Sequence, residues 1–140
     1  MPGRLRVLSV GSTELTHLVR DALLLCPRSC LLVAATFWDL CSLSLHETEK
    51  VSVAVLDLSS SEHELRQNTE HIRRRWPDAE ILLVGDNLDH LDDPLYDERV
   101  SAEIQPSELL TVVERLVAHK RRASRFRRRR IAEGKGRYGA

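Results

Sequence analysis

The chain has 140 residues, of which 42% are hydrophobic and 30% charged, and its formal net charge is zero. This length fits one globular domain, and this composition excludes a disordered chain. The longest apolar runs, over residues 22–26 and 31–38, are too short to span a bilayer, and no secretory signal is visible. We therefore expect a cytoplasmic protein with no transmembrane segment and with three reduced cysteines: Cys26, Cys30 and Cys41.

The two signs of charge are unevenly distributed along the chain. Ten of the 21 Lys and Arg, but only one of the 21 Asp and Glu, lie in residues 120–140. An acidic body is thus followed by a basic tail. We expect one folded domain over residues 1–119 and a basic tail or helix extension over residues 120–140.

The first part of the chain alternates apolar runs with amphipathic stretches. Residues 5–10 predict a strand, and Ser12 after it predicts a helix N-cap. Residues 13–25 then predict a helix, and a second strand over residues 31–35 precedes a short helix over residues 39–47. The first helix has an apolar face made of Leu15, Leu18, Ala22 and Leu25.

The same alternation continues through the middle of the chain. A third strand over residues 51–56 ends at Asp57. The serines at residues 59–61 predict the cap of a long helix. A fourth apolar run, over residues 81–84, predicts another strand.

The last part of the body is less regular. Residues 86–98 are acidic and predict a solvated loop with at most a short helix, although a cation or a basic partner is an alternative use of its charges. Residues 100–104 predict a weak fifth strand, and Pro106 suits the first turn of a helix. That helix has an apolar stripe made of Leu109, Leu110, Val113, Leu116 and Val117.

Five strands that alternate with helical stretches predict an α/β fold. The first, third and fourth strands are nearly continuous apolar runs, which is typical of a parallel sheet between two helix layers. In such sheets the reactive crevice lies outside the carboxyl ends of the strands. The residues that we expect just past those ends are Gly11, Asp57, Gly85 and Gln105.

From about residue 5 to residue 119, the chain resembles a receiver domain of bacterial two-component signalling. Residues 51–57 resemble the third strand of that family, whose final Asp accepts a phosphoryl group. Residues 103–106 resemble the ending of its fifth strand, where a Lys precedes Pro. The resemblance implies a flavodoxin-like (CheY-like) doubly wound (βα)5 sandwich with a five-stranded parallel sheet. It also implies a role in phosphorelay signal transduction, with Asp57 as the candidate phospho-acceptor.

Most of the other residues that the family uses are replaced. The family has an acidic pair that binds Mg²⁺ after the first strand, where this chain has Gly11 and Ser12. Gly85 stands where the family has Thr or Ser, and Gln105 stands where it has Lys. Ala102 occupies the position of an aromatic residue that usually takes part in switching.

Phosphoryl transfer to a carboxylate brings two negative charges together, so Mg²⁺ and a cationic side chain must offset the charge. Asp57 alone supplies one ligand, and we therefore expect a degenerate pseudo-receiver in which phosphorylation is vestigial or lost. Asp57 is also interpreted as a strand-end acid that caps the next turn. Alternatively, Glu14 or Asp86 replaces the missing carboxylate and Asp57 still accepts phosphate. We expect no resident cofactor, and Mg²⁺ only if Asp57 is phosphorylated.

The basic tail has several interpretations. It is a solvated extension, or it binds nucleic acid, an anionic membrane surface or an acidic protein. One aromatic residue, Phe126, is too few for a base-stacking platform. The positive residues at its start are Lys120, Arg121, Arg122, Arg125, Arg127, Arg128, Arg129 and Arg130.

The remaining patterns do not favour an enzyme. The strand ends carry no Ser–His–Asp or Cys–His set, and the six histidines are scattered as on an ordinary surface. We therefore predict a stand-alone, non-enzymatic response-regulator receiver that acts through protein–protein contacts. Its partner would be a histidine kinase or a downstream regulator, bound at the last helix and the fifth strand.

Overall fold

The computed structural model describes residues 5–46, 49–57, 61–86 and 96–118, which contain one five-stranded parallel sheet. The strands are β1 (Leu5–Val10), β2 (Ser29–Ala34), β3 (Val53–Asp57), β4 (Glu80–Val84) and β5 (Glu98–Val100). They lie in the order β2-β1-β3-β4-β5, which is the flavodoxin-like order. The predicted fold class is confirmed.

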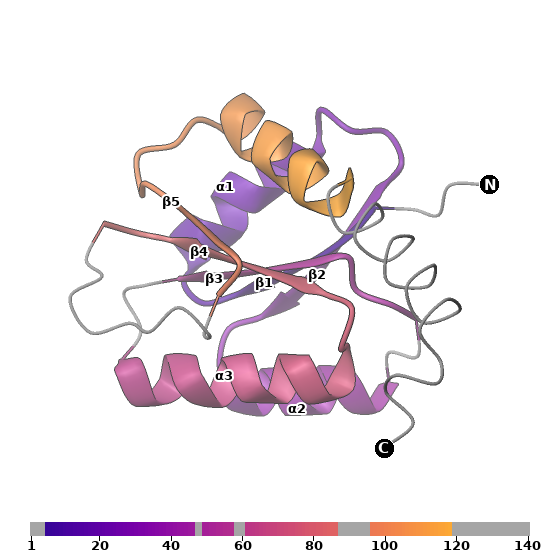
Figure 1. Ribbon diagram of the computed structural model, residues 1–140, viewed down its shortest axis with the longest axis vertical. Coiled ribbons are helices and arrows are strands. Elements are labelled where there is room, and N and C mark those ends of the chain that lie inside the picture. The colour runs from indigo at the N-terminus through magenta and orange to yellow at the C-terminus, as the bar shows by residue number, and fades with distance from the viewer. Residues whose placement is uncertain (1–4, 47–48, 58–60, 87–95, 119–140) are drawn as a thin grey trace, which may run out of the picture.

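Helices cover both faces of the sheet (Figure 1). Three of them are α1 (Thr13–Leu23), α2 (Phe37–His46) and α3 (Glu62–Arg75). A fourth helix over residues 106–118, which we call the C-terminal helix, follows β5. The helix α1 lies with the C-terminal helix on one face, and α2 lies with α3 on the other. This is the three-layer arrangement that continuous apolar strands require.

The core consists of two hydrophobic clusters, one on each side of the sheet. Because side chains alternate along a strand, Val53 and Val55 pack toward α1 and the C-terminal helix, whereas Ala54 and Leu56 pack toward α2 and α3. All four are at most 1% exposed. Burial of both faces explains why β3 reads as an apolar run rather than an alternating pattern.

The helices begin where the sequence predicts caps. The Ser12 hydroxyl accepts a hydrogen bond from Leu15 N at 3.2 Å, and the Ser61 hydroxyl accepts one from Glu64 N at 3.1 Å. In the C-terminal helix the predicted apolar stripe is confirmed. Its buried members are Leu109, Val113 and Leu116.

Several predicted boundaries are wrong: β2 begins at Ser29 instead of residue 31, α2 begins at Phe37 instead of residue 39, and β3 begins at Val53 instead of residue 51. The end of the first helix and the position of the fifth strand are wrong as well. The first helix ends at Leu23 instead of Leu25, because the chain turns ahead of Pro27, and Leu25 is 57% exposed. The fifth strand is Glu98–Val100 instead of residues 100–104. Its charged residues lie at a sheet edge where they reach solvent, and residues 101–105 form a turn in which Ile104 N donates to Ser101 O.

Several predictions fall on residues outside the described ranges. These are the cap serines 59 and 60, most of the acidic loop, and the basic tail from Lys120. In the part of the chain that is described, no helix is both long and apolar enough to cross a membrane.

Candidate functional site

The carboxyl ends of β1, β3 and β4 meet at one end of the sheet. Asp57 is the last residue of β3, and it is paired in register with Val84 of β4, while Val10 of β1 is paired with Leu56. Asp57 is half-buried. The central strand thus presents one carboxylate between its two neighbours, where ligands of doubly wound sheets bind.

The hydroxyl of Ser12 is a close polar partner of Asp57. The Ser12 hydroxyl donates to Asp57 Oδ2 over 2.6 Å and accepts from Leu15 N over 3.2 Å. One side chain therefore caps α1 and engages the carboxylate of β3. Hydrogen bonds to a charged acceptor are short and stronger than neutral ones. Ser12 ties the start of α1 to the carboxylate that a phosphoryl group would have to reach.

Gly11 allows β1 to pass close to Asp57. A Cβ at position 11 would lie 2.6 Å from Asp57 Cβ and 3.3 Å from Leu15 Cδ2. The backbone there has φ of +142°, a conformation that L-residues with side chains rarely adopt. No acidic side chain fits at this position without a shift of the backbone, so the first member of the family's acidic pair has no place here.

Gly85 has a similar backbone at the end of β4. Its φ is +153°, and its amide donates to Val100 O over 2.9 Å, which joins β4 to β5. A Thr or Ser hydroxyl at this position would require a strained backbone. Gly11 and Gly85, the two glycines that depart from the family pattern, therefore suit the backbone conformation at the ends of β1 and β4.

A hollow of about 180 Å³ lies beside Asp57. Glu14 is part of its wall, whereas Asp86 and Gln105 are both exposed and are not. Of the predicted site residues, the structure brings Asp57, Ser12, Glu14 and Ala102 together in the wall of this hollow and places Gly11 against Asp57, whereas Asp86 and Gln105 are not among the lining residues. The lining residues are Ser12, Glu14, Leu15, Leu18, Asp57, Val84 and Ala102.

Two of the residues that line this hollow, Asp57 and Glu14, carry a carboxylate that Mg²⁺ could use. This ion prefers several carboxylate and water oxygens in a near-octahedral shell. Gly11 offers no side chain, and Ser12 uses its hydroxyl proton on Asp57. Within the described residues there is no group of three His, Cys, Asp or Glu side chains arranged to hold a metal ion.

Sequence reasoning identified Asp57 and the replaced positions but missed the apolar wall and the second role of Ser12. Leu18 and Val84 were assigned only to a helix face and a strand. The cap signal identified Ser12 correctly, but a cap pattern says nothing about what else the hydroxyl donates to. The separation of 45 residues between Ser12 and Asp57 becomes a contact only through the sheet order.

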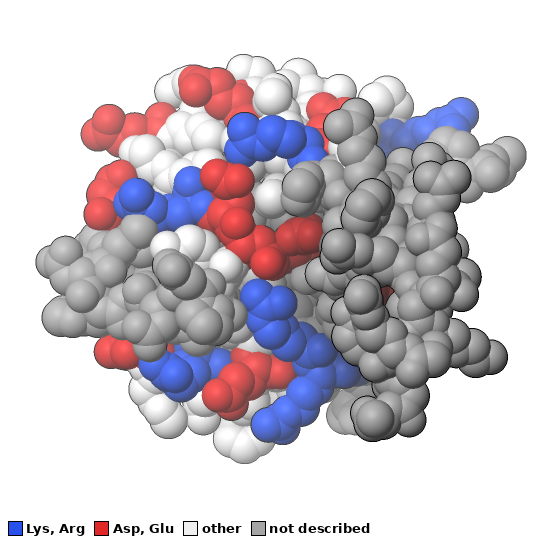
Figure 2. All heavy atoms as spheres, viewed as in Figure 1, with Lys and Arg blue, Asp and Glu red and all other residues white. Residues whose placement is uncertain are grey.

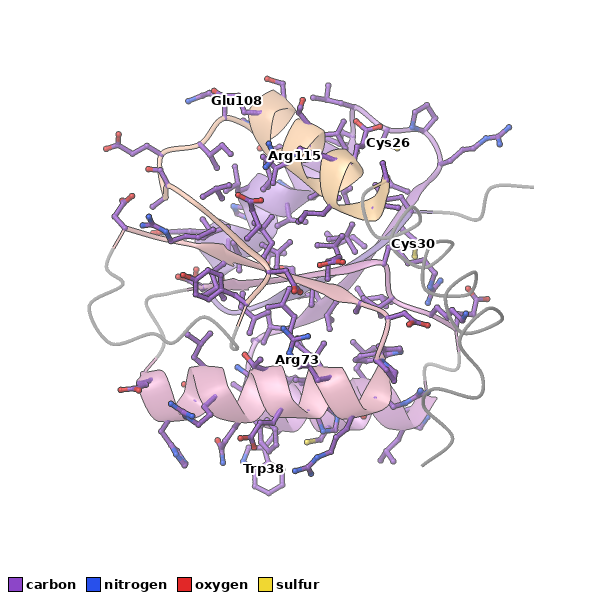
Figure 3. The ribbon with its side chains drawn as sticks, viewed as in Figure 1. Cys26, Cys30, Trp38, Arg73, Glu108 and Arg115 are labelled. Carbon is purple, nitrogen blue, oxygen red and sulfur yellow. The ribbon has the colours of Figure 1, made fainter. Side chains whose placement is uncertain are left out.

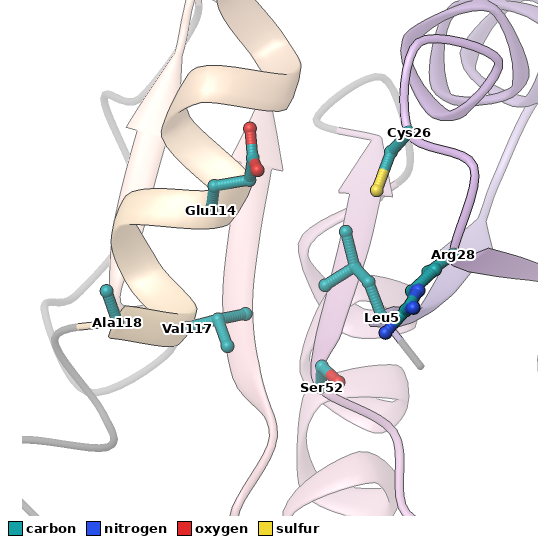
Figure 4. A pocket seen from close by; sticks show the side chains of 7 residues that line it. All are labelled: Leu5, Cys26, Arg28, Ser52, Glu114, Val117 and Ala118. Atoms are coloured by element: carbon teal, nitrogen blue, oxygen red, sulfur yellow. The ribbon is translucent and has the colours of Figure 1, made fainter. Parts of the chain in front are cut away.

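A second hollow, of about 210 Å³, lies away from Asp57, at the ends where β1 and β2 begin. Figure 4 shows Glu114 on the C-terminal helix across from Cys26 and Arg28, which come from the turn before β2. The wall is a mixture of isolated polar groups on different elements.

One histidine has a perturbed environment between α2 and α3. His71 Nε2 lies 2.9 Å from the Ser44 hydroxyl, which itself donates to Cys41 O, and Phe37 meets the imidazole edge-on. Because the hydroxyl proton is used on Cys41, His71 Nε2 is the donor. Burial, and then the charges of Arg74 and Arg75, lower the pKa of His71 below its ordinary value of 6.5. His71 is thus a half-buried part of the packing and not a surface histidine.

No protein-family model and no curated protein sequence matches the chain. Solved structures do match. A receiver domain of an HD domain-containing protein from Pseudomonas fluorescens has a TM-score of 0.68 at 16% identity, over 89% of this chain and 95% of the other. A CheY-like receiver domain protein from Methanospirillum hungatei has a TM-score of 0.71 at 16% identity, over 86% of this chain and 99% of the other.

A third similar structure carries a different name. It is described as an adenylate cyclase from Rhodopirellula baltica and has a TM-score of 0.71 at 12% identity, over 89% of this chain and 96% of the other. At these identities the likeness establishes the fold alone. The chain has the fold of response-regulator receiver domains.

Proposed function

We propose that this chain is a receiver-type signalling domain that acts through protein–protein contacts and no longer uses Asp57 as a phospho-acceptor. The observation that carries the proposal is the 2.6 Å hydrogen bond from Ser12 to Asp57, next to two glycines with positive φ. The carboxylate of Asp57 is retained, but the acidic pair that would activate it is absent. The helix cap Ser12 and Gly11, which has no side chain, stand in its place.

The charge balance of the reaction supports this conclusion. Transfer of a phosphoryl group to Asp57 needs a cation at the attacking oxygen, and removal of one charge-stabilising group commonly lowers a rate by about 10²–10³. A side chain at the first acidic position would require a shift of the backbone, and Gln105, the counterpart of the cationic Lys, is not part of the hollow. Such losses are not additive, but both act in the same direction.

The surface proposed for partners consists of β5 and the C-terminal helix. Figure 2 shows acidic and basic side chains interleaved on this side of the molecule. Arg115 of the helix pairs with Glu98 of β5 at 3.2 Å, and both side chains keep solvent exposure. A partially exposed ion pair is worth little to stability, so these charges are available to a charged partner such as a histidine kinase or a downstream regulator.

A magnesium titration tests this proposal. The amide signals of Gly11, Ser12 and Asp57 are followed by NMR while Mg²⁺ is added to the folded chain, with Ca²⁺ as a comparison. We expect no saturating shift at these three amides, because Gly11 and Ser12 stand in place of the acidic pair and leave too few carboxylates for a magnesium site. A saturating, Mg²⁺-specific shift that the Asp57→Asn variant loses would show a working metal site and would overturn the proposal.

A second candidate function is a phospho-acceptor rebuilt around Glu14. The observation that favours it is the place of Glu14 in the wall of the same hollow as Asp57. In that case Glu14→Gln would abolish any Mg²⁺-dependent shift at Asp57. The matching change Asp86→Asn would have no effect, because Asp86 is not part of the hollow.

The basic tail supplies a further proposed partner. Its positive residues lie outside the described ranges, so the support comes from composition alone. Binding to nucleic acid or anionic vesicles that weakens steeply with salt and disappears when residues 120–140 are deleted would establish it.

A further inference from the structure

The two edges of the sheet are built differently. The strand β5 forms one edge and contains three residues, of which Glu98 and Arg99 are charged. The strand β2 forms the other edge and contains six residues, Ser29–Ala34, with no charge and no proline. Natural proteins usually blunt an edge with short strands and charges, because an open edge pairs with other chains. By this criterion β5 is protected and β2 is not.

The register of β2 shows which backbone groups are open. Leu5 N donates to Arg28 O and Gly11 N donates to Ala34 O, so the even-numbered residues of β2 turn their backbone groups toward β1. Leu31 and Val33 therefore turn their N–H and C=O groups outward. Among the described residues, neither of them has a hydrogen bond on that outer side.

Exposed apolar side chains collect in the same segment of the chain. Val33 on β2 itself is 47% exposed, although it belongs to a strand. Leu24 and Leu25, in the turn before β2, are exposed as well. Trp38 and Leu45 are exposed on α2, but Figure 3 shows that Trp38 points away from the sheet, so α2 is not part of the argument.

We propose that β2 pairs with β2 of a second copy of this chain, antiparallel across a two-fold axis, so that the two sheets become continuous. In this alignment Leu31 lies opposite Val33 of the second copy, and the two residues form two hydrogen bonds between their outward N–H and C=O groups. The two-fold axis generates the same pair a second time, between Val33 and Leu31 of the second copy. An uncharged strand is suited to this contact because no like charges meet along it. The proposal does not depend on whether Asp57 accepts phosphate.

The charges at the two ends of β2 favour this alignment. Arg28 is exposed just before the strand, and Asp39 is exposed just after it, where its Oδ2 accepts from Ala35 N over 3.2 Å. In the antiparallel pairing, Arg28 comes opposite Thr36 of the second copy and hence beside its Asp39. Opposite charges therefore meet at both ends of the strand, which sets the direction and register of the contact.

Sedimentation equilibrium over a dilution series tests the proposal. Val33→Pro removes an outward N–H without breaking a bond to β1, and Pro is tolerated on an edge when its missing donor faces solvent. We expect the wild type to dimerise and the dissociation constant of Val33→Pro to rise about tenfold or more, since both copies lose a donor. The control is Arg99→Pro on β5, whose N–H also faces outward and whose loss leaves the dimer unchanged.

A wild-type chain that stays monomeric throughout the series, or a dimer that survives Val33→Pro, would overturn the proposal. So would a dimer that Arg99→Pro weakens equally. If Val33→Pro loses the circular dichroism of the native fold, Val33→Lys replaces it, because a charged side chain at an exposed position leaves the core intact and opposes pairing.

A charge variant tests the antiparallel alignment separately. Arg28→Glu places a second negative charge beside Asp39 of the other copy, and we expect the dissociation constant to rise about five- to tenfold at low salt. Arg20→Glu, at an exposed arginine of α1, is the matched control and leaves the constant unchanged. An unchanged constant for Arg28→Glu would contradict the alignment.

Discussion

The interior of the sheet and its carboxyl ends differ in what they keep of the receiver design. The interior is complete, since β1, β3 and β4 are buried and helices cover both faces. The strand ends keep Asp57 but hold glycines and a serine where the chemistry needs charge. A fold requires only apolar residues in the right period, whereas a reaction requires particular groups at particular positions. The fold is therefore retained, whereas under the proposed function the reaction is not.

The largest expected effect comes from the interior. Leu82 of β4 is fully buried against α1 and the C-terminal helix. Leu82→Ala should lower the free energy of unfolding by about 2–5 kcal/mol, because it removes buried methyl groups and leaves a cavity. Asp57→Asn keeps the shape and an acceptor for Ser12, and should change it by less than about 1 kcal/mol. Urea unfolding measures both, and similar losses for the two variants would contradict the contrast.

A methyl group at Gly11 tests how tightly the end of β1 packs against Asp57. Gly11→Ala should cost about 1–3 kcal/mol, because φ is +142° and the new Cβ would collide with Asp57 Cβ. Gly85→Ala, at the end of β4, shares the positive φ and should also be destabilising. Thermal unfolding of the two variants measures these costs. A Gly11→Ala chain as stable as the wild type would show that a side chain fits there after all.

A comparison of Ser12 with Ser61 separates the contribution of a helix cap from the contribution of the hydrogen bond to Asp57. Ser12→Ala removes a cap and the hydrogen bond to Asp57, whereas Ser61→Ala removes a cap alone. We expect losses of about 1–2 kcal/mol for Ser12→Ala and about 1 kcal/mol for Ser61→Ala. Combining each change with Asp57→Ala, which removes the acceptor, completes the comparison by urea unfolding. Equal losses for the two serines would mean that the contact with Asp57 contributes nothing.

The smallest expected effect is a pH dependence within the α2–α3 layer. Burial and two arginines lower the pKa of His71 in the folded state, so the unfolded chain binds the proton more readily. Stability from this group is present above pH 6.5 and declines as the pH falls below it. His71→Gln should flatten this part of the urea-midpoint profile between pH 8 and pH 5, whereas His63→Gln, at an exposed position of α3, should not. A slope unchanged by His71→Gln would refute this assignment.

Sequence patterns predicted the parts of the molecule that burial determines. The apolar runs of β1, β3 and β4 and the caps at Ser12 and Ser61 were identified because each rests on local chemistry. The strand β5 was misplaced because an exposed edge tolerates charge, which hides the apolar signal. The contact of Ser12 with Asp57 and the crowding at Gly11 depend on strands distant in sequence, and no local pattern contains that information.

The most direct test of the central claim is intact-mass analysis after incubation with acetyl phosphate and Mg²⁺, with Asp57→Asn beside the wild type and a phosphorylatable receiver as the positive control. The account predicts no phosphate adduct on either form of this chain under conditions that modify the positive control. A wild-type adduct that is absent from Asp57→Asn would contradict the account, because it would show that Asp57 still accepts a phosphoryl group.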